Sequence, residues 1–206
     1  LNLFLFLPPS FLFLRCGFPA TRLSFVIFES QPTFLEYPLD NAITIIVLVE
    51  YDHSGIKPVT YELLNAARNL ADNGKIIALY FTGVENVDES PLIHYGADEI
   101  RICIHPAYHQ YTHETYAAGL QSEIEKIQPD IVLMPASNSG KELSAAVATR
   151  LGVVVASDCI EVQRSEEGKV TIKRPVFAGK AYSLCKLSGP KPYLITLRPN
   201  CFRGER

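Results

Sequence analysis

The sequence lacks the cysteine pattern of a disulfide-stabilised or zinc-binding protein. Its five cysteines are an odd number, lie far apart, and include neither a Cys-x-x-Cys pair nor a Cys/His cluster at zinc-finger spacing. They are Cys16, Cys103, Cys159, Cys185 and Cys201. This usage predicts buried, inert thiols in a reducing compartment, with Cys103, Cys159 and Cys185 as small core residues.

The chain also lacks an excess of charge of either sign. Its 206 residues carry 19 lysines and arginines against 22 aspartates and glutamates, a formal net charge of −3. No basic face is indicated for nucleic acid, and no acidic tail for a solvating role. We therefore expect no nucleic-acid partner. Because 48% of the residues are apolar, the chain has enough apolar side chains for one sizeable core, and one domain is the default.

Several motifs of catalytic or phosphate-binding chemistry are missing. The sequence has no Gly-x-Ser-x-Gly elbow, no Gly-x-x-x-x-Gly-Lys-Ser/Thr loop, no Gly-x-Gly-x-x-Gly fingerprint and no Ser-Gly-Gly-x-Asp-Ser loop of adenylating enzymes. A hydrolase and an adenylating enzyme are therefore unsupported, and we expect no catalytic residues.

The first 41 residues differ from the rest. Residues 1–14 are a Leu/Phe run broken by Pro8 and Pro9, the first basic residue is Arg15, and no acidic residue precedes Glu29. The run is too short to span a bilayer and has its positive charge on the wrong side for a secretory signal, so we expect no membrane insertion. We interpret residues 1–41 as a disordered leader or a non-native upstream segment. A mitochondrial transit peptide is the alternative.

From Ala42 onward, short β-branched runs alternate with helical spacing, a pattern typical of βαβ units. Strands are predicted over residues 43–50, 75–81, 99–104, 130–134 and 153–155, and helices over residues 58–73, a short piece ending near Gly96, 113–127 and 141–151. After Ser157 come strand-like segments without helices between them: 159–164, 169–175, 181–187 and 193–197. We expect these four to be antiparallel additions. The fold class is therefore α/β: a doubly wound, mostly parallel Rossmann-like sheet with helices on both faces and a C-terminal antiparallel β extension.

One loop at the carboxyl end of a predicted strand could hold an anion. It contains Ser137, Asn138, Ser139, Gly140 and Lys141, whose small side chains would let backbone N–H groups at a helix start point at a phosphate. The alternative, which we favour, is that Ser137 or Ser139 only caps the following helix.

Two further groups of residues are weaker candidates. His105, His109 and His113 would stack on one face of a continuous helix and could bind a metal, but Pro106 favours a loop and no supporting ligand is nearby in the sequence, so we expect no metal site. A second set stands beside proline or glycine in the C-terminal region, where a binding or interface role competes with simple solvation. This set is Arg174, Lys180 and Arg198.

Several segments, taken in order, resemble the alpha subunit of electron transfer flavoproteins. They are residues 47–51 (VLVEY) with 57–60 (KPVT), 129–132 (PDIV) leading to 139–143 (SGKEL), 157–158 (SD), 174–180 (RPVFAGK), and 198–202 (RPNCF), which is similar to the family's element at the end of the first domain. The resemblance covers residues 42–202. Residues 203–206 would then begin a linker to a second domain that lies outside this chain.

The resemblance implies a heterodimer of alpha and beta subunits. Such an electron carrier takes electrons from acyl-CoA and related dehydrogenases, as in fatty acid oxidation, and passes them to a quinone oxidoreductase. FAD would be held by the second domain of the parent protein, and this chain would be the docking base for the beta subunit. The loop from Ser137 to Lys141 would be a vestigial anion site. The expected location is the bacterial cytoplasm, with the mitochondrial matrix as the alternative. The competing function is a stand-alone adenine-nucleotide-binding module that uses the same loop.

Overall fold

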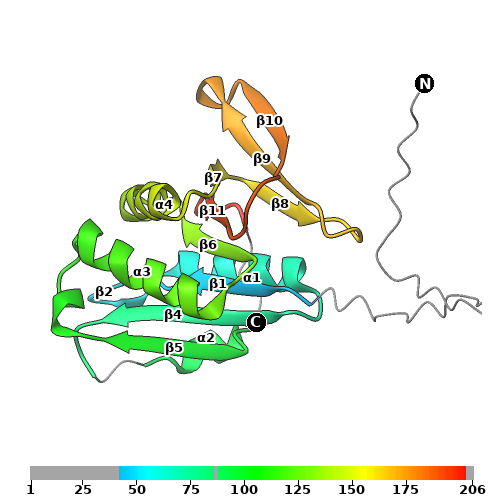
Figure 1. The fold of residues 1–206 in the computed structure, drawn as a ribbon. Coiled ribbons are helices and arrows are strands. Elements are labelled where there is room, and N and C mark those ends of the chain that lie inside the picture. The colour runs from blue at the N-terminus through cyan, green and yellow to red at the C-terminus, as the bar shows by residue number, and fades with distance from the viewer. Residues whose placement is uncertain (1–41, 86–87, 203–206) are drawn as a thin grey trace, which may run out of the picture. The chain divides into compact units, whose positions relative to one another are not determined.

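The computed structural model describes residues 42–85 and 88–202 (Figure 1). The leader expected over residues 1–41 and the linker expected over residues 203–206 lie outside this part of the chain.

A six-stranded sheet forms the centre of the fold, in the order β5-β4-β1-β6-β11-β7, and every neighbouring pair in it is parallel (Figure 1). Its strands are β1 (Thr44–Leu48), β4 (Lys75–Thr82), β5 (Glu99–Ile104), β6 (Ile131–Pro135), β7 (Val155–Cys159) and β11 (Tyr193–Leu197). The chain adds β4 and β5 on one side of β1, and then β6, β7 and β11 on the other. The direction of winding therefore reverses between β1 and β6, which is a topological switch point.

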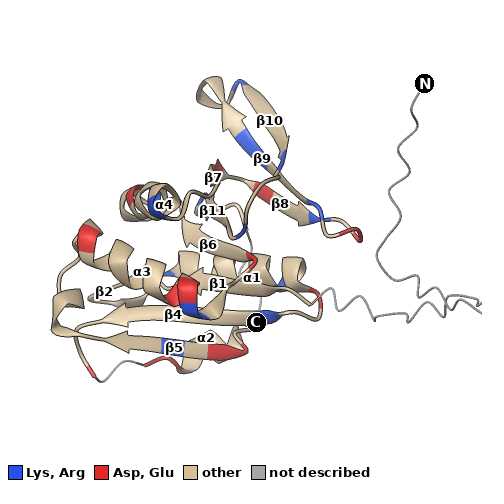
Figure 2. Cartoon of the chain, in the orientation of Figure 1, with Lys and Arg blue, Asp and Glu red and all other residues tan. Residues whose placement is uncertain are grey.

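Charged residues of both signs occur in the edge strand β5 (Figure 2). Glu99 pairs with Lys75 at 2.6 Å and with Arg101 at 3.0 Å, and Arg101 reaches Glu123 on the neighbouring helix at 3.2 Å. Charges along an exposed edge disfavour the addition of a foreign strand there.

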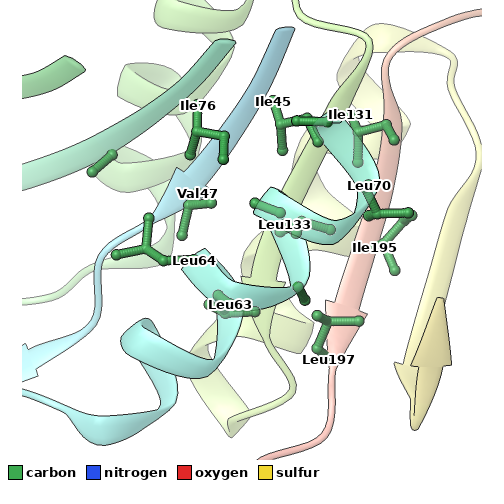
Figure 3. Packing of buried hydrophobic residues seen from close by; sticks show 14 of the residues in the cluster. Ile45, Val47, Leu63, Leu64, Leu70, Ile76, Ile131, Leu133, Ile195 and Leu197 are labelled. Atoms are coloured by element: carbon green, nitrogen blue, oxygen red, sulfur yellow. The ribbon is translucent and has the colours of Figure 1, made fainter. Parts of the chain in front are cut away.

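Strand β1 is buried on both faces, because its alternate side chains enter two different cores. Ile45 and Val47 pack in a cluster with residues of α1 (Pro58–Ala71), as Figure 3 shows. Ile46 and Leu48 enter a second cluster, formed with α3 (His113–Ile127) and α4 (Asn138–Leu151). This explains why the strand is a continuous apolar run rather than an alternating one. The prediction of helices on both faces is confirmed.

The helix ends follow local sequence signals. α1 begins at Pro58, where a missing N–H costs nothing, and the short α2 (Ser90–His94) has proline in its first turn. α4 is followed by Gly152 in the left-handed conformation, with φ 66°.

Two small antiparallel sheets complete the described residues. One is the hairpin of β2 (Tyr51–Asp52) and β3 (Gly55–Ile56) that follows β1. The other has the order β10-β9-β8 and consists of β8 (Glu161–Arg164), β9 (Val170–Val176) and β10 (Ala181–Lys186). Val170 and Ile172 join it to the same core as α1. This second sheet confirms the predicted antiparallel extension.

The prediction for residues 193–197 was wrong in direction. β11 is not an antiparallel addition but a parallel strand inserted between β6 and β7, with Leu194 and Ile195 fully buried. The β8–β10 sheet connects the end of β7 to the start of the parallel strand β11. It therefore makes the crossover that a helix makes elsewhere in the fold.

Several boundaries differ from the sequence prediction, and two of them differ most. α4 begins at Asn138 rather than residue 141, because Ser137 supplies the cap. The fifth strand covers Val155–Cys159 rather than residues 153–155, so Cys159 ends one strand instead of beginning the next.

Gly140 fixes how closely α4 approaches β6. A Cβ atom at this position would lie 1.9 Å from the backbone oxygen of Pro135, at the end of β6. A backbone carbonyl cannot rotate away as a flexible side chain could, so the helix and the strand would have to separate.

We therefore predict that Gly140→Ala lowers the free energy of unfolding by about 1–3 kcal/mol. Helix propensity alone gives the opposite sign, a gain of about 1 kcal/mol for glycine to alanine. Urea unfolding followed by circular dichroism measures the change, with Thr149→Ala on the exposed side of α4 as the control. A stabilised Gly140→Ala variant would contradict the close approach.

Candidate functional site

A cleft of about 530 Å³ lies at the carboxyl ends of β1, β4 and β6, at the switch point of the sheet. Open parallel sheets bind ligands in this position, and the volume is in the range of small-molecule sites. The lining includes Glu50, Tyr51, Lys57, Thr82, Gly83, His109, Tyr111, Tyr116, Pro135, Ser139, Gly140 and Leu143.

The floor of the cleft carries a carboxylate. Glu50 follows β1, its side chain is 16% exposed, and its Oε1 accepts hydrogen bonds from Ser139 Oγ at 3.3 Å and Lys57 Nζ at 3.4 Å. Thr60 fixes the backbone of Glu50: its hydroxyl donates to the Glu50 carbonyl at 3.1 Å and accepts from the Glu50 N–H at 3.0 Å. A negative charge of the protein itself therefore lies against the first turn of α4, where the helix dipole favours an anion.

The five residues of the predicted anion loop are split between a cap and the first turn of α4. Ser137 Oγ accepts from the Gly140 N–H at 3.1 Å, so the helix cap that we favoured is present. Asn138 is exposed, and Ser139 faces Glu50. Lys141 Nζ lies 3.8 Å from Asp158 Oδ1 and does not line the cleft.

Tyrosines form one wall of the cleft. The rings of Tyr111 and Tyr116 are 4.9 Å apart at an interplanar angle of 58°. Tyr111 Oη donates to the Ser139 carbonyl at 3.2 Å and to Glu142 Oε2 at 3.3 Å, which ties this wall to α4. Burial and the Glu142 carboxylate raise the pKa of Tyr111 to about 12. Both hydroxyls remain protonated donors at neutral pH, since burial also raises the pKa of Tyr116.

The three histidines do not lie on one continuous helix. His105 precedes the 3₁₀ helix η1 (Pro106–Tyr108) and its Nδ1 accepts from the Ala107 N–H at 3.1 Å, whereas His113 begins α3. His109 packs against Gly83, where a Cβ atom would come within 2.5 Å of the His109 Cα. Among residues 42–85 and 88–202, no group of three His, Cys, Asp or Glu side chains could hold a metal.

Arg198, one of the three basic candidates, pairs within the domain. Its guanidinium donates to Asp158 Oδ1 at 3.1 Å and to Oδ2 at 2.6 Å. Asp158 has φ 63°, a left-handed conformation that aspartate tolerates better than most residues. Arg174 and Lys180 are exposed in or beside the β9–β10 hairpin.

The cysteine prediction holds for some positions only. Cys159 is fully buried, and burial raises its pKa to about 12; Cys103 and Cys185 are half-buried. Cys201 is exposed, so the expectation of a buried thiol was wrong there, because residues after β11 run over the surface. Cys16 lies outside the described residues.

The Arg198–Asp158 pair predicts a pH-dependent stability. Hydrogen bonding from Arg198 lowers the pKa of Asp158, with Lys141 as a further cation. A lowered folded-state pKa stabilises the fold above the ordinary range of the group, and the effect is lost as pH falls through the lowered value. Arg198→Gln should therefore reduce stability at neutral pH, and the difference from the native chain should shrink on acidification.

Urea unfolding at a series of pH values measures this difference, with Arg150→Gln at the end of α4 as the control. A deficit of Arg198→Gln that is independent of pH would show that packing, rather than the charge of Asp158, is responsible.

The described fold and cleft define a doubly wound, Rossmann-like domain with an antiparallel extension. A family model described as the electron transfer flavoprotein domain matches residues 45–205, and the chain belongs to this family. The resemblance to the alpha subunit inferred from the sequence is confirmed.

Similar proteins of known family support this assignment. The chain is 34% identical over 158 residues to the electron transfer flavoprotein subunit alpha of Bacillus subtilis, covering 76% of this chain and 47% of that protein. It is 30% identical over 181 residues to the lactate dehydrogenase (NAD(+),ferredoxin) subunit LctC of Acetobacterium woodii, covering 86% and 42%. It is 29% identical over 160 residues to Protein FixB of Azorhizobium caulinodans, covering 74% and 43%. The chain thus spans less than half the length of these relatives.

A solved structure, the antimicrobial reagent A40926 pseudoaglycone deacetylase Dbv21, shares 13% identity with a TM-score of 0.29, covering 55% of this chain and 62% of that one, too low to bear on fold or function. None of the helices in the described part of the chain is long and apolar enough to cross a membrane.

Proposed function

We propose that this chain is the docking base of a heterodimeric electron transfer flavoprotein, on which a beta subunit assembles. The parent complex carries electrons from acyl-CoA and related dehydrogenases to a quinone oxidoreductase and is itself a carrier rather than an enzyme. We place it in the bacterial cytoplasm, with the mitochondrial matrix as the alternative. Family membership supports the electron-carrier role. The observation that carries the docking role is an exposed apolar hairpin.

The hairpin of β9 and β10 presents three large apolar side chains to solvent. Phe177 is 79% exposed, Leu184 73% and Tyr182 58%. Tyr182 and Leu184 are two residues apart on β10 and so share one face of the sheet, while Cys185 on the opposite face packs against the core. Exposed apolar side chains gathered on one element mark a protein–protein contact surface more often than isolated ones do.

The tip of this hairpin holds its aromatic residue in a costly backbone conformation. Phe177 and Ala178 have φ 51° and 54°, the left-handed region that favours glycine. A non-glycine residue there costs about 1–2 kcal/mol. A bulky aromatic side chain that is both exposed and held in this conformation contributes little to the fold, which supports a role in contact with a partner.

We predict that Phe177→Ser and Leu184→Ser weaken binding to an electron transfer flavoprotein beta subunit by at least about tenfold each, because aromatic and aliphatic anchors dominate such contacts. The melting temperature should change little, since both side chains are exposed. Isothermal titration with a purified bacterial beta subunit measures the affinity. Ile93→Ser is the matched control, because Ile93 is 62% exposed but lies on α2, away from the hairpin.

Phe177→Gly separates docking from strain. Glycine relieves the left-handed backbone, so this variant should keep or raise the melting temperature while it loses the affinity that Phe177 provides. If all three hairpin variants bind the beta subunit with native affinity, the docking surface lies elsewhere.

We propose further that FAD is held by parts of the parent protein outside residues 42–202. Two observations support this: the cleft at the switch point carries the Glu50 carboxylate beside α4, where a cofactor phosphate would otherwise bind, and the five loop residues act as a cap and a first helical turn.

The purified chain is accordingly expected to show no visible absorbance from flavin. Reconstitution with excess FAD, followed by gel filtration, should leave the chain colourless. Flavin that coelutes in a one-to-one ratio would place the cofactor on this chain instead.

A further inference from the structure

The switch-point cleft has the size and the walls of a small-molecule site, independently of the docking role. It encloses about 530 Å³ between three strand ends and α4. Apolar surface comes from Leu48 and Leu143, and flat aromatic surface from Tyr111 and Tyr116. Planar heteroaromatic groups of many kinds stack on tyrosine rings.

The charge in this cleft is the reverse of that in a phosphate site. The position beside the first turn of α4 that an anion would occupy is held by the Glu50 carboxylate, which Ser139 Oγ and Lys57 Nζ bind through Oε1. Lys57 is thereby committed to a partner within the protein. A phosphate brought to this point would meet a fixed negative charge in a partly buried site, where like charges repel more strongly than in water.

Glu50 also provides what an uncharged ligand needs. Only its Oε1 has a hydrogen-bond partner among the described residues, so Oε2 can accept from hydroxyl or amine groups of a ligand. Thr60 holds the backbone of Glu50, and the bonds from Ser139 and Lys57 to Oε1 hold its side chain. A carboxylate fixed beside aromatic rings matches a molecule with a flat heteroaromatic part and adjacent hydroxyl donors.

We propose that this cleft binds an uncharged, nucleoside-sized heteroaromatic compound, and that Glu50 selects against its phosphorylated form. The aromatic part stacks against Tyr111 or Tyr116, and the hydroxyl groups donate to Glu50. No bond is made or broken. Selectivity comes from the carboxylate that occupies the place of the phosphate.

Adenosine and AMP are the probes, since they share the aromatic part and the sugar and differ in the phosphate. Isothermal titration of the full chain should show saturable binding of adenosine and binding of AMP at least about tenfold weaker. Glu50→Gln removes the negative charge but keeps the shape and one acceptor oxygen. It should strengthen the binding of AMP relative to that of adenosine by about tenfold or more, measured as the ratio of the two dissociation constants.

Glu166→Gln, an equal change of charge in the exposed turn between β8 and β9, is the matched control and should leave the ratio unchanged. Tyr111→Leu provides a second test if Glu50→Gln fails to fold: it removes the stacking ring and should weaken both ligands alike, so the ratio stays at the native value. Circular dichroism confirms that each variant is folded.

Two results would overturn the proposal. One is AMP binding to the native chain as tightly as adenosine, which would make the cleft an ordinary nucleotide site. The other is that neither compound binds at millimolar concentration. Both outcomes leave the docking role of the β9–β10 hairpin untouched, because that surface is tested with a beta subunit and shares no residue with the cleft.

Discussion

The rest of the structure depends on the burial of β1 on both of its faces. Ile45, Ile46 and Val47 have no exposed surface, and their side chains point alternately into two cores. A strand with no solvent face needs a helical layer on each side and a strand on each edge. Once β4 pairs on one edge and β6 on the other, the chain winds away from β1 in both directions. The cleft at the switch point is a geometric result of that arrangement, and Glu50 lies in it because it comes just beyond the carboxyl end of the buried strand.

Elements formed by local signals could be predicted from the sequence. The strand Glu99–Ile104 and the helix His113–Ile127 were expected at these bounds, because apolar spacing, Pro129 and the surrounding polar residues all favour the same result. The direction of β11 could not be predicted, since pairing direction depends on how the chain returns to the sheet and not on the strand itself. The missing helix before it suggested an antiparallel partner, whereas the β8–β10 sheet makes the crossover.

The position of one loop beside the cleft was predicted from the sequence, but the side chains that line the cleft were not. The loop of Ser137 was correctly located at a strand end near the switch point, and a serine cap was one of the two interpretations offered. Glu50 and Tyr111 were missed as members of the site, because they lie far apart in the sequence, at positions 50 and 111. One signal was available: Glu50 is a charged residue just after a largely apolar strand. Residues beyond the carboxyl ends of parallel strands lie on the side of the sheet where ligands bind.

The position of β11 has a consequence for synthesis of the protein. β7 pairs within the main sheet through β11 alone among the described strands, although β11 follows it by more than thirty residues along the chain, as the ranges Val155–Cys159 and Tyr193–Leu197 show. A nascent chain on the ribosome can assemble β1, β4, β5 and β6 as they emerge, but a gap stays beside β6 until β11 has emerged. Among the described strands, the last in the sequence is thus the one that joins β7 to the sheet, so this sheet is complete only after β11 has left the exit tunnel.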